Sequence, residues 1–152
     1  MLIYVFWALL LTLVTVSLHG VCTVILLAII RKLSLQYRKK VSRRVDHLFL
    51  LARLVVGLLF VHCLEAVIWA TYYLADNRFA NLETALYFSL TSYTTIGYGD
   101  VVLGENIRLV GAIEGLAGTF MCGWSVALLV SVTQFIIKMD YFSADMTPED
   151  ML

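Results

Sequence analysis

Charged residues are scarce in this chain, and so are prolines, cysteines and histidines. Only 14% of the 152 residues are Asp, Glu, Lys or Arg, whereas 61% are hydrophobic, well above the roughly 45–50% apolar usage of soluble domains. The net charge is zero, and the single proline leaves no proline-rich linker to divide the chain. The composition therefore excludes an ordinary soluble domain and indicates a membrane protein.

The few cysteines and histidines exclude two further classes. Cys22, Cys63 and Cys122 each lie inside an apolar run and are odd in number, so a secreted-type disulfide framework is not expected. The histidines, at positions 19, 47 and 62, lie in separate segments, and no nucleophile–base spacing or carboxylate pair indicates an enzyme. The Gly-x-Gly run at 97–99 lacks the lysine and the helix start of a phosphate-binding loop.

Three apolar runs are long enough to cross a membrane as helices. They are Leu2–Ile30, Leu54–Leu74 and Leu109–Ile137, and a rise of about 1.5 Å per residue takes each across a hydrocarbon layer of about 30 Å. No basic residue precedes the first run, which is twice as long as the apolar core of a secretory signal. We therefore expect the first run to be a retained span.

Basic residues are concentrated between the first two spans. Seven of the eleven fall within residues 31–44, a stretch without an acid. Lys and Arg near span ends stay on the cytoplasmic side, which predicts an external N-terminus and a cytoplasmic C-terminus. The candidates for contact with anionic membrane lipid are Arg38, Lys39, Lys40, Arg43 and Arg44. A solvated turn is the alternative for this stretch.

A shorter helix is predicted between the second and third spans. Asn81 is a suitable N-cap and Glu83 places an acid in the first turn, which together favour a helix from Leu82 to about Thr94. Thirteen residues reach only about 20 Å, too short to span. We therefore expect this helix to enter from the outer side and to return through the run Thr94–Asp100.

The returning run contains two glycines and must be shielded from lipid. Non-helical backbone at membrane depth is tolerated only inside protein or along a water-filled path. Consecutive carbonyls point to one side of a strand when backbone handedness alternates, and glycine accepts positive φ at little steric cost. Gly97 and Gly99, two residues apart, suit that alternation. The carbonyls could then replace the water shell of a cation, and the Thr95 hydroxyl could add an oxygen ligand.

The sequence Thr-Thr-Ile-Gly-Tyr-Gly-Asp at 94–100 resembles the signature of the potassium-channel family. Residues 87–91 resemble that family's aromatic-rich pore helix, and the resemblance covers about 54–137. It implies an all-α membrane protein with three transmembrane helices, a re-entrant pore helix and a selectivity filter, assembled as a homotetramer. The domains would be an N-terminal helix (1–30), a basic cytoplasmic loop (31–46), a pore domain (47–138) and a short acidic tail (139–152).

The resemblance also implies roles for individual residues. The permeant ion, K⁺, would be bound along the filter, which comprises Thr95, Ile96, Gly97, Tyr98 and Gly99. The Tyr98 ring would pack behind the filter. Asp100 would stand at the outer mouth, and a hydrogen bond to the pore helix is compatible with that role. Gly118 and Gly123 resemble the inner-helix glycines, where the channel would bend on gating.

Other polar residues within the spans are candidates for structural or gating roles. Thr119, Cys122, Val126 and Val130 recur at three- and four-residue steps, so they share a face that either lines the cavity or packs. Charged groups inside spans are costly, which singles out Glu65, His62 and Glu114; His62 and Glu65 are three residues apart and share a helix face.

Thr91 and Tyr93 stand where some relatives carry a glutamate and a small residue. One of the two acids could therefore brace the filter near Tyr93, or both could merely tie helices together. The aromatic residues near the span ends, Trp7, Trp69, Tyr72 and Tyr73, are interpreted as interfacial anchors.

Two alternatives to a potassium channel remain open. One is a weakly selective cation channel, because the surroundings of the filter differ from those in some relatives. The other is a non-conducting membrane subunit or scaffold that keeps the channel-like fold. A voltage sensor is not expected, because the basic residues lie in a loop and not at regular spacing within a span.

Overall fold

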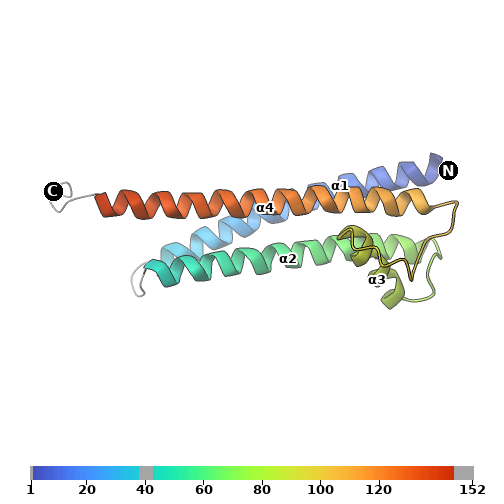
Figure 1. Ribbon diagram of the computed structural model, residues 1–152, viewed down its shortest axis with the longest axis horizontal. Coiled ribbons are helices and arrows are strands. Elements are labelled where there is room, and N and C mark those ends of the chain that lie inside the picture. The colour runs from blue at the N-terminus through green and yellow to red at the C-terminus, as the bar shows by residue number, and fades with distance from the viewer. Residues whose placement is uncertain (1, 38–42, 146–152) are drawn as a thin grey trace.

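The computed structural model describes residues 2–37 and 43–145, and it describes side chains over 2–32 and 47–138. Four helices and no strand are found in this part of the chain (Figure 1). They are α1 (Leu2–Tyr37), α2 (Arg43–Ala75), α3 (Leu82–Tyr93) and α4 (Arg108–Asp145). The fold is all-helical, as the apolar runs predict.

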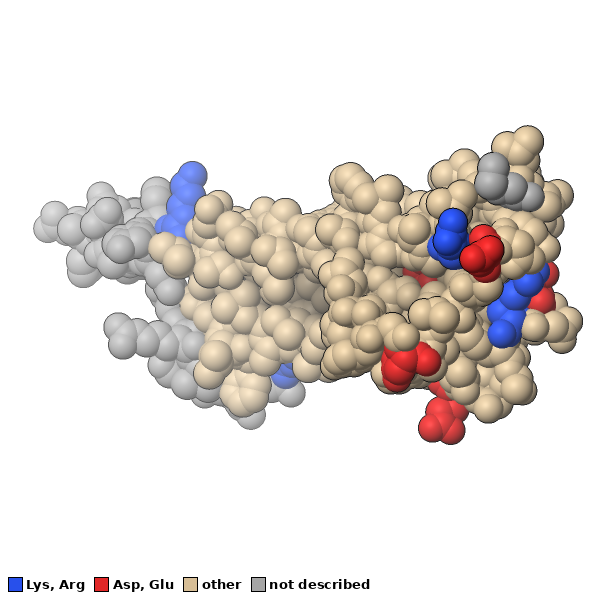
Figure 2. Space-filling model, turned by 45° about the vertical axis from the view of Figure 1, so that its right-hand side comes forward, with Lys and Arg blue, Asp and Glu red and all other residues tan. Residues whose placement is uncertain are grey.

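Three of these helices are long and apolar enough to cross a membrane. The candidate spans are Leu2–Lys32, His47–Ala75 and Arg108–Lys138. The N-terminus lies at the same end of the molecule as α3, while the C-terminal end of α4 lies at the opposite end (Figure 1). Charged side chains gather toward the ends of the face shown in Figure 2, with a wide uncharged stretch between them. This distribution is that of a multi-pass membrane protein.

Both helices that flank the basic stretch are longer than the sequence predicts. Residues 31–37 continue α1 and residues 43–46 begin α2, so the expected loop over 31–46 is too long. Arg, Lys, Leu and Gln are good helix formers, and no Gly or Pro interrupts them. Arg43 and Arg44 are the first residues of α2, whereas Arg38, Lys39 and Lys40 lie outside the described residues. Likewise α4 continues to Asp145, into the segment expected to be a tail.

The short helix α3 begins where the sequence predicts. Asn81 has extended backbone, with φ −149° and ψ 163°, and its Oδ1 accepts a hydrogen bond of 2.9 Å from the backbone N–H of Thr84. The Thr84 hydroxyl donates to the same oxygen. Glu83 lies in the first turn, where a negative charge is favourable. Asn81 is thus the N-cap, and α3 ends at Tyr93, one residue before the expected end.

The core lies where α1, α2, α3 and α4 meet. Trp69 and Tyr73 of α2 are fully buried there, and the Tyr73 ring packs edge-on against Phe88 of α3. The interpretation of Trp69 and Tyr73 as interfacial anchors is therefore wrong, because α3 covers this end of α2. Trp7, by contrast, is 45% exposed.

Helix α1 also contributes to the interior. Its buried residues recur along one face, at Ala8, Thr15, His19, Thr23 and Ile30. Three of these five carry polar side chains, which is unusual for a face buried between apolar helices. The N-terminal helix is therefore packed against α2 and α4 through a partly polar stripe.

Glycines allow α4 to approach the end of α3 closely. A Cβ added to Gly118 would lie 1.9 Å from the carbonyl oxygen of Tyr93, and one added to Gly115 would lie 3.1 Å from that of Ser92. A Cβ on Gly123 would meet nothing within 4 Å. Close packing against α3 therefore favours glycine at position 118. Its role as a hinge stays a prediction, because α4 is continuous through this position.

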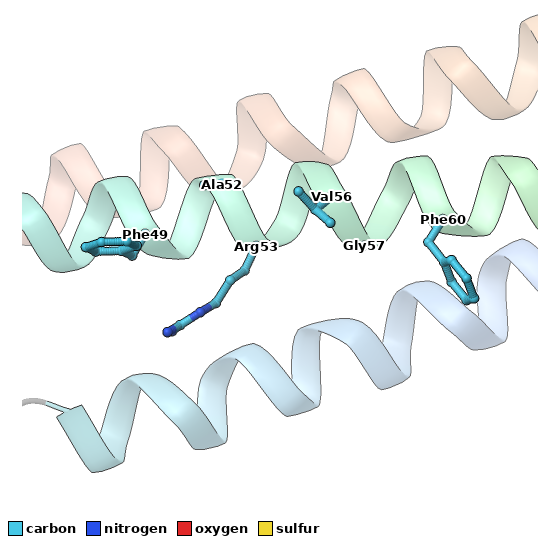
Figure 3. A pocket seen from close by; sticks show the side chains of 6 residues that line it. All are labelled: Phe49, Ala52, Arg53, Val56, Gly57 and Phe60. Atoms are coloured by element: carbon cyan, nitrogen blue, oxygen red, sulfur yellow. The ribbon is translucent and has the colours of Figure 1, made fainter.

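A shallow apolar groove runs along α2 (Figure 3). Its lining residues are Phe49, Ala52, Arg53, Val56, Gly57 and Phe60. Val56 and Phe60 are each more than half exposed. Such a surface suits contact with lipid chains and not with water.

We predict that Gly118→Ala weakens the packing of α4 on α3, because backbone atoms cannot move aside as a flexible side chain can. Overpacking of this kind typically costs about 1–3 kcal/mol. The thermal unfolding temperature of the purified protein in detergent should fall, and that of the matched variant Gly123→Ala should not. Equal stability of the two variants would contradict the close contact.

Candidate functional site: an exposed carbonyl run and its buried supports

The run after α3 alternates in backbone handedness. Positive φ values occur at Thr95 (62°), Gly97 (52°) and Gly99 (81°), every second residue. No atom lies within 4 Å of a Cβ built on Gly97 or Gly99, so backbone conformation and not crowding is what favours glycine in this chain. The glycine spacing predicts two of these angles. The positive φ at Thr95 was not predicted from the sequence.

Three backbone hydrogen bonds fold the start of the run against the end of α3. The N–H of Thr94 donates to the Leu90 carbonyl at 3.1 Å, and that of Thr95 donates to the Ser92 carbonyl at 3.0 Å. The N–H of Gly97 donates to the Thr91 carbonyl at 3.0 Å. These bonds offset the cost of positive φ at a residue that carries a Cβ.

The carbonyls of Thr95 to Gly99 behave differently from these N–H groups. None of them accepts a hydrogen bond from the part of the chain that the structure describes. Ile96 is 55% and Tyr98 71% exposed, so neither apolar side chain is covered within one chain. Unpaired carbonyls are costly away from water. In the described part of the chain, these carbonyls are therefore left open to water, an ion or a neighbouring molecule.

Asp100 lies just beyond the last glycine and is attached to α3. It accepts a hydrogen bond of 2.8 Å from the hydroxyl of Tyr87, an exposed contact that raises the pKa of Tyr87. The hydrogen bond to the short helix expected as one role of Asp100 is thus present. Its placement at an outer mouth stays a prediction.

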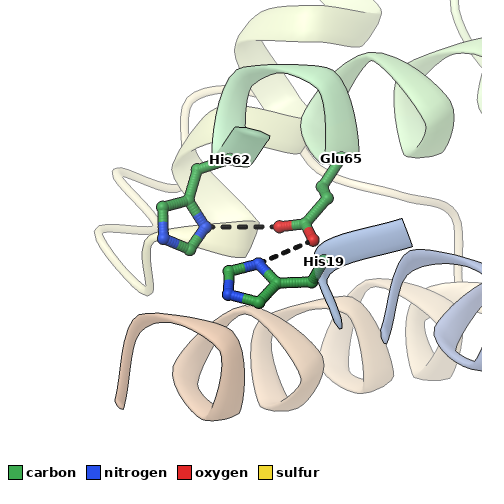
Figure 4. A group of neighbouring side chains, drawn as sticks. All are labelled: His19, His62 and Glu65. Atoms are coloured by element: carbon green, nitrogen blue, oxygen red, sulfur yellow. Dashed lines mark hydrogen bonds and ion pairs between the residues drawn. The ribbon is translucent and has the colours of Figure 1, made fainter. Parts of the chain in front are cut away.

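Glu65 lies behind the end of α3 and is fully buried. Its Oε2 accepts a hydrogen bond from the Tyr93 hydroxyl and lies 3.2 Å from His62 Nδ1. Its Oε1 lies 3.0 Å from His19 Nδ1 (Figure 4). One carboxylate thus connects α1, α2 and α3.

Glu114 of α4 makes the second buried carboxylate contact with α3. It accepts hydrogen bonds from the hydroxyls of Ser89 and, at 2.7 Å, Tyr73. Ser89 and Tyr93 are four residues apart, so the two carboxylates contact α3 about one turn from each other. Both acids therefore lie behind the short helix, where the sequence predicted one. Each also ties helices together, and an effect on the filter stays a prediction.

Thr91, the remaining bracing candidate, touches neither carboxylate. Its hydroxyl donates to the carbonyl of Phe88 at 3.0 Å, within its own helix.

The role of His19 was missed by sequence reasoning, which treated the histidines as scattered. The rings of His19 and His62 lie 5.2 Å apart, from positions 43 residues apart in the chain. A signal was present in the first span, because Thr15, His19 and Thr23 recur every four residues. A polar stripe on one face of an apolar helix marks a face turned toward protein.

The four cavity-lining candidates do not share one environment. Thr119 is exposed, Val126 is 59% exposed and Val130 is 50% exposed. Cys122 is half-buried and packs against the core. Three of the four are therefore open on the surface of a single chain, and whether they line a cavity stays a prediction.

Comparison with known proteins identifies the class. A family model described as "ion channel" matches residues 53–135, more than half of the chain. No curated protein and no solved structure matches. The chain therefore belongs to this ion channel family. The matched segment begins inside α2 and contains all of α3, the carbonyl run and most of α4.

We predict that Tyr93→Phe destabilises the protein far more than Tyr87→Phe does. Each change removes one hydroxyl that donates to a carboxylate, but Glu65 is buried whereas Asp100 is exposed and water can replace the lost donor. Loss of a bond to a buried charged group costs about 1.5–3 kcal/mol, whereas exposed pairs contribute little. Thermal or denaturant unfolding in detergent measures the difference. Equal losses would show that Glu65 does not depend on Tyr93.

Proposed function

We propose that this ion channel is selective for potassium and that four copies gather residues 95–99 around a common axis. The observation that carries the proposal is the backbone of this run: handedness alternates at Thr95, Gly97 and Gly99, and the carbonyls accept no hydrogen bond from the residues that the structure describes. Carbonyl rings of this kind replace the hydration shell of K⁺.

A single chain cannot complete such a site. One strand offers oxygens from one side only, so encircling an ion requires several copies related by rotation, and four is the number in carbonyl filters. The exposed apolar side chains of Ile96, Tyr98 and Val102 support this assembly. In a tetramer, neighbouring subunits would cover them, and the Tyr98 ring would pack behind the filter.

Each residue of the run would have its own role at a different position along the axis. Carbonyls of Thr95, Ile96, Gly97 and Tyr98 would bind K⁺, with the Thr95 hydroxyl at the inner end. Gly99 permits the last turn of the ribbon, and Asp100 would stand at the outer mouth. The C-terminal end of α3 precedes the run directly, so its negative dipole end would favour a cation waiting below the filter.

The remaining candidates fit the same arrangement. Thr119, Val126 and Val130 would line a mostly apolar cavity, with Cys122 at its edge against the core, and Gly118 and Gly123 would let α4 bend. An external N-terminus and a cytoplasmic C-terminus follow from the basic stretch between α1 and α2. Its residues Arg38, Lys39, Lys40, Arg43 and Arg44 would attract anionic lipid.

We predict a reversal potential close to that of potassium when the purified protein is reconstituted in liposomes or planar bilayers with mixed potassium and sodium. Barium should block the current. Gly99→Ala should reduce potassium flux, because alanine at φ 81° is strained by about 1–2 kcal/mol, which corresponds to roughly tenfold if the strain destabilises the conducting form. Gly104→Ala is the matched control, because Gly104 has no positive φ and a Cβ there would meet only the end of the Asn106 side chain.

Other outcomes would support a different function. Currents that reverse midway between the potassium and sodium potentials would indicate a weakly selective cation channel. A protein that is folded and reconstituted but carries no current would indicate a non-conducting subunit. Either result would overturn the proposed selectivity.

A further inference from the structure

The carboxylate of Glu65 and the two nearby imidazoles form a cluster that filter support alone does not explain. His19, His62 and Glu65 each direct one donor atom into a common space, with all three atoms within 4.8 Å of one another (Figure 4). His19 and Glu65 are fully buried and the His62 side chain is 16% exposed. The carboxylate contacts α3 through Tyr93, and the two imidazoles converge on the same carboxylate from α1 and α2.

Each imidazole nitrogen lies about as close to an oxygen of Glu65 as two ligands of a small metal ion lie to each other. Glu65 Oε1 lies 3.0 Å from His19 Nδ1, and Oε2 lies 3.2 Å from His62 Nδ1. Ligands about 2.0–2.1 Å from a tetrahedral zinc ion are about 3.3 Å from each other. Small rotations of the side chains would bring the three donors to that geometry. The Tyr93 hydroxyl, 3.2 Å from His62 Nδ1, borders the same space and leaves a fourth position for the phenol oxygen or a water.

The outer side of both imidazoles is held by one residue of α4. The Ser125 hydroxyl lies 2.9 Å from His62 Nε2 and 3.4 Å from His19 Nε2. Metal-bound histidines characteristically use their second ring nitrogen in this way, which fixes ring orientation and tautomer. Ser125 is itself buried, so it is a fixed part of the cluster.

Counting protons shows that the cluster requires one more positive charge, either an added proton on an imidazole or a metal ion. If neutral His19 and His62 each donate Nδ1–H to Glu65, both Nε2 atoms need a donor, and Ser125 has only one proton to give. If both Nδ1 atoms bind a metal, each Nε2 carries a proton and donates to a lone pair of Ser125 Oγ. Both second ring nitrogens are then paired, as they also are when one histidine is protonated, and Glu65 places a negative charge beside the cation.

We propose that His19, His62 and Glu65 form a binding site for a divalent transition-metal ion of the zinc type, held between α1 and α2 behind the end of α3. Two imidazoles and a carboxylate are a common zinc ligand set. The ion would enter past His62, the one ligand of the three with an exposed surface. Because His19 belongs to α1 and the other ligands to α2, metal binding clamps the N-terminal helix onto the segment that supports α3.

Binding of Co²⁺ and Zn²⁺ to the purified full-length protein tests the site, after removal of any affinity histidines. Co²⁺ should produce the visible absorption of a tetrahedral complex at about one ion per chain, and Zn²⁺ should abolish it by displacement. Zn²⁺ should also raise the thermal unfolding temperature, because a ligand that binds only the folded state stabilises it. Neither readout depends on ion conduction, so both remain informative if the proposed selectivity fails.

Substitutions of the three ligand residues test whether Co²⁺ and Zn²⁺ bind at this cluster. His19→Gln and His62→Gln should each lose the Co²⁺ absorption and the Zn²⁺-induced rise in unfolding temperature. His47→Gln changes the remaining histidine, which is not part of the cluster. This variant should retain both the Co²⁺ absorption and the Zn²⁺-induced rise in unfolding temperature. Size-exclusion profiles matching those of the unchanged protein establish that each variant is folded, and Glu65→Gln provides a further ligand change that keeps the side-chain shape. If a variant does not fold, titration of the unchanged protein with Co²⁺ still tests the site, because it measures the number of ions bound per chain and their coordination geometry.

Two results would overturn the proposal. The first is a native protein that gives no tetrahedral Co²⁺ spectrum and no Zn²⁺-dependent stabilisation. The second is binding that survives His19→Gln and His62→Gln but is lost in His47→Gln, which would place the metal elsewhere. In either case the cluster would be a hydrogen-bond network only.

Discussion

The carbonyl oxygens of residues 95–99 set the requirement that the rest of the structure meets. They follow a helix too short to span a membrane, and they accept no hydrogen bond from the described part of the chain. In the proposed channel, lipid could not satisfy them, and water at membrane depth would need a protein-lined path. The proposal therefore requires a fold that holds this run in place without pairing it, so that its oxygens remain available to an ion.

The short helix α3 is held from several sides to achieve this. Its last turn contacts the buried carboxylate of Glu65, the preceding turn contacts that of Glu114, and Gly118 lets α4 approach the Tyr93 carbonyl. Helices in a membrane gain no hydrophobic energy by leaving lipid for one another, so close approach at small residues and polar contacts must position them. The buried serine, tyrosine and histidine partners of the two carboxylates meet that need. Through His19, the N-terminal helix α1 joins the same network.

Local patterns were predictable from the sequence, and contacts between distant segments were not. The spans follow from apolar length, and the start of α3 follows from the capping chemistry of Asn81. The angles at Gly97 and Gly99 follow from their spacing. By contrast, the polar stripe of α1 marks which face of that helix turns toward protein, but not that His19 meets Glu65, because that contact depends on how α1 packs against α2. The burial of Trp69 and Tyr73 depends on α3 folding back over them, and the helical extension at 31–37 depends on a context that charge alone does not indicate.

The most direct test of the account is a structure of the assembled protein, determined with a heavy potassium analogue such as rubidium or thallium. The account predicts four subunits around an axis, with ion peaks on that axis ringed by the carbonyls of Thr95, Ile96, Gly97 and Tyr98. A stable monomer or dimer, or carbonyls turned away from a shared axis with no ion between them, would contradict it.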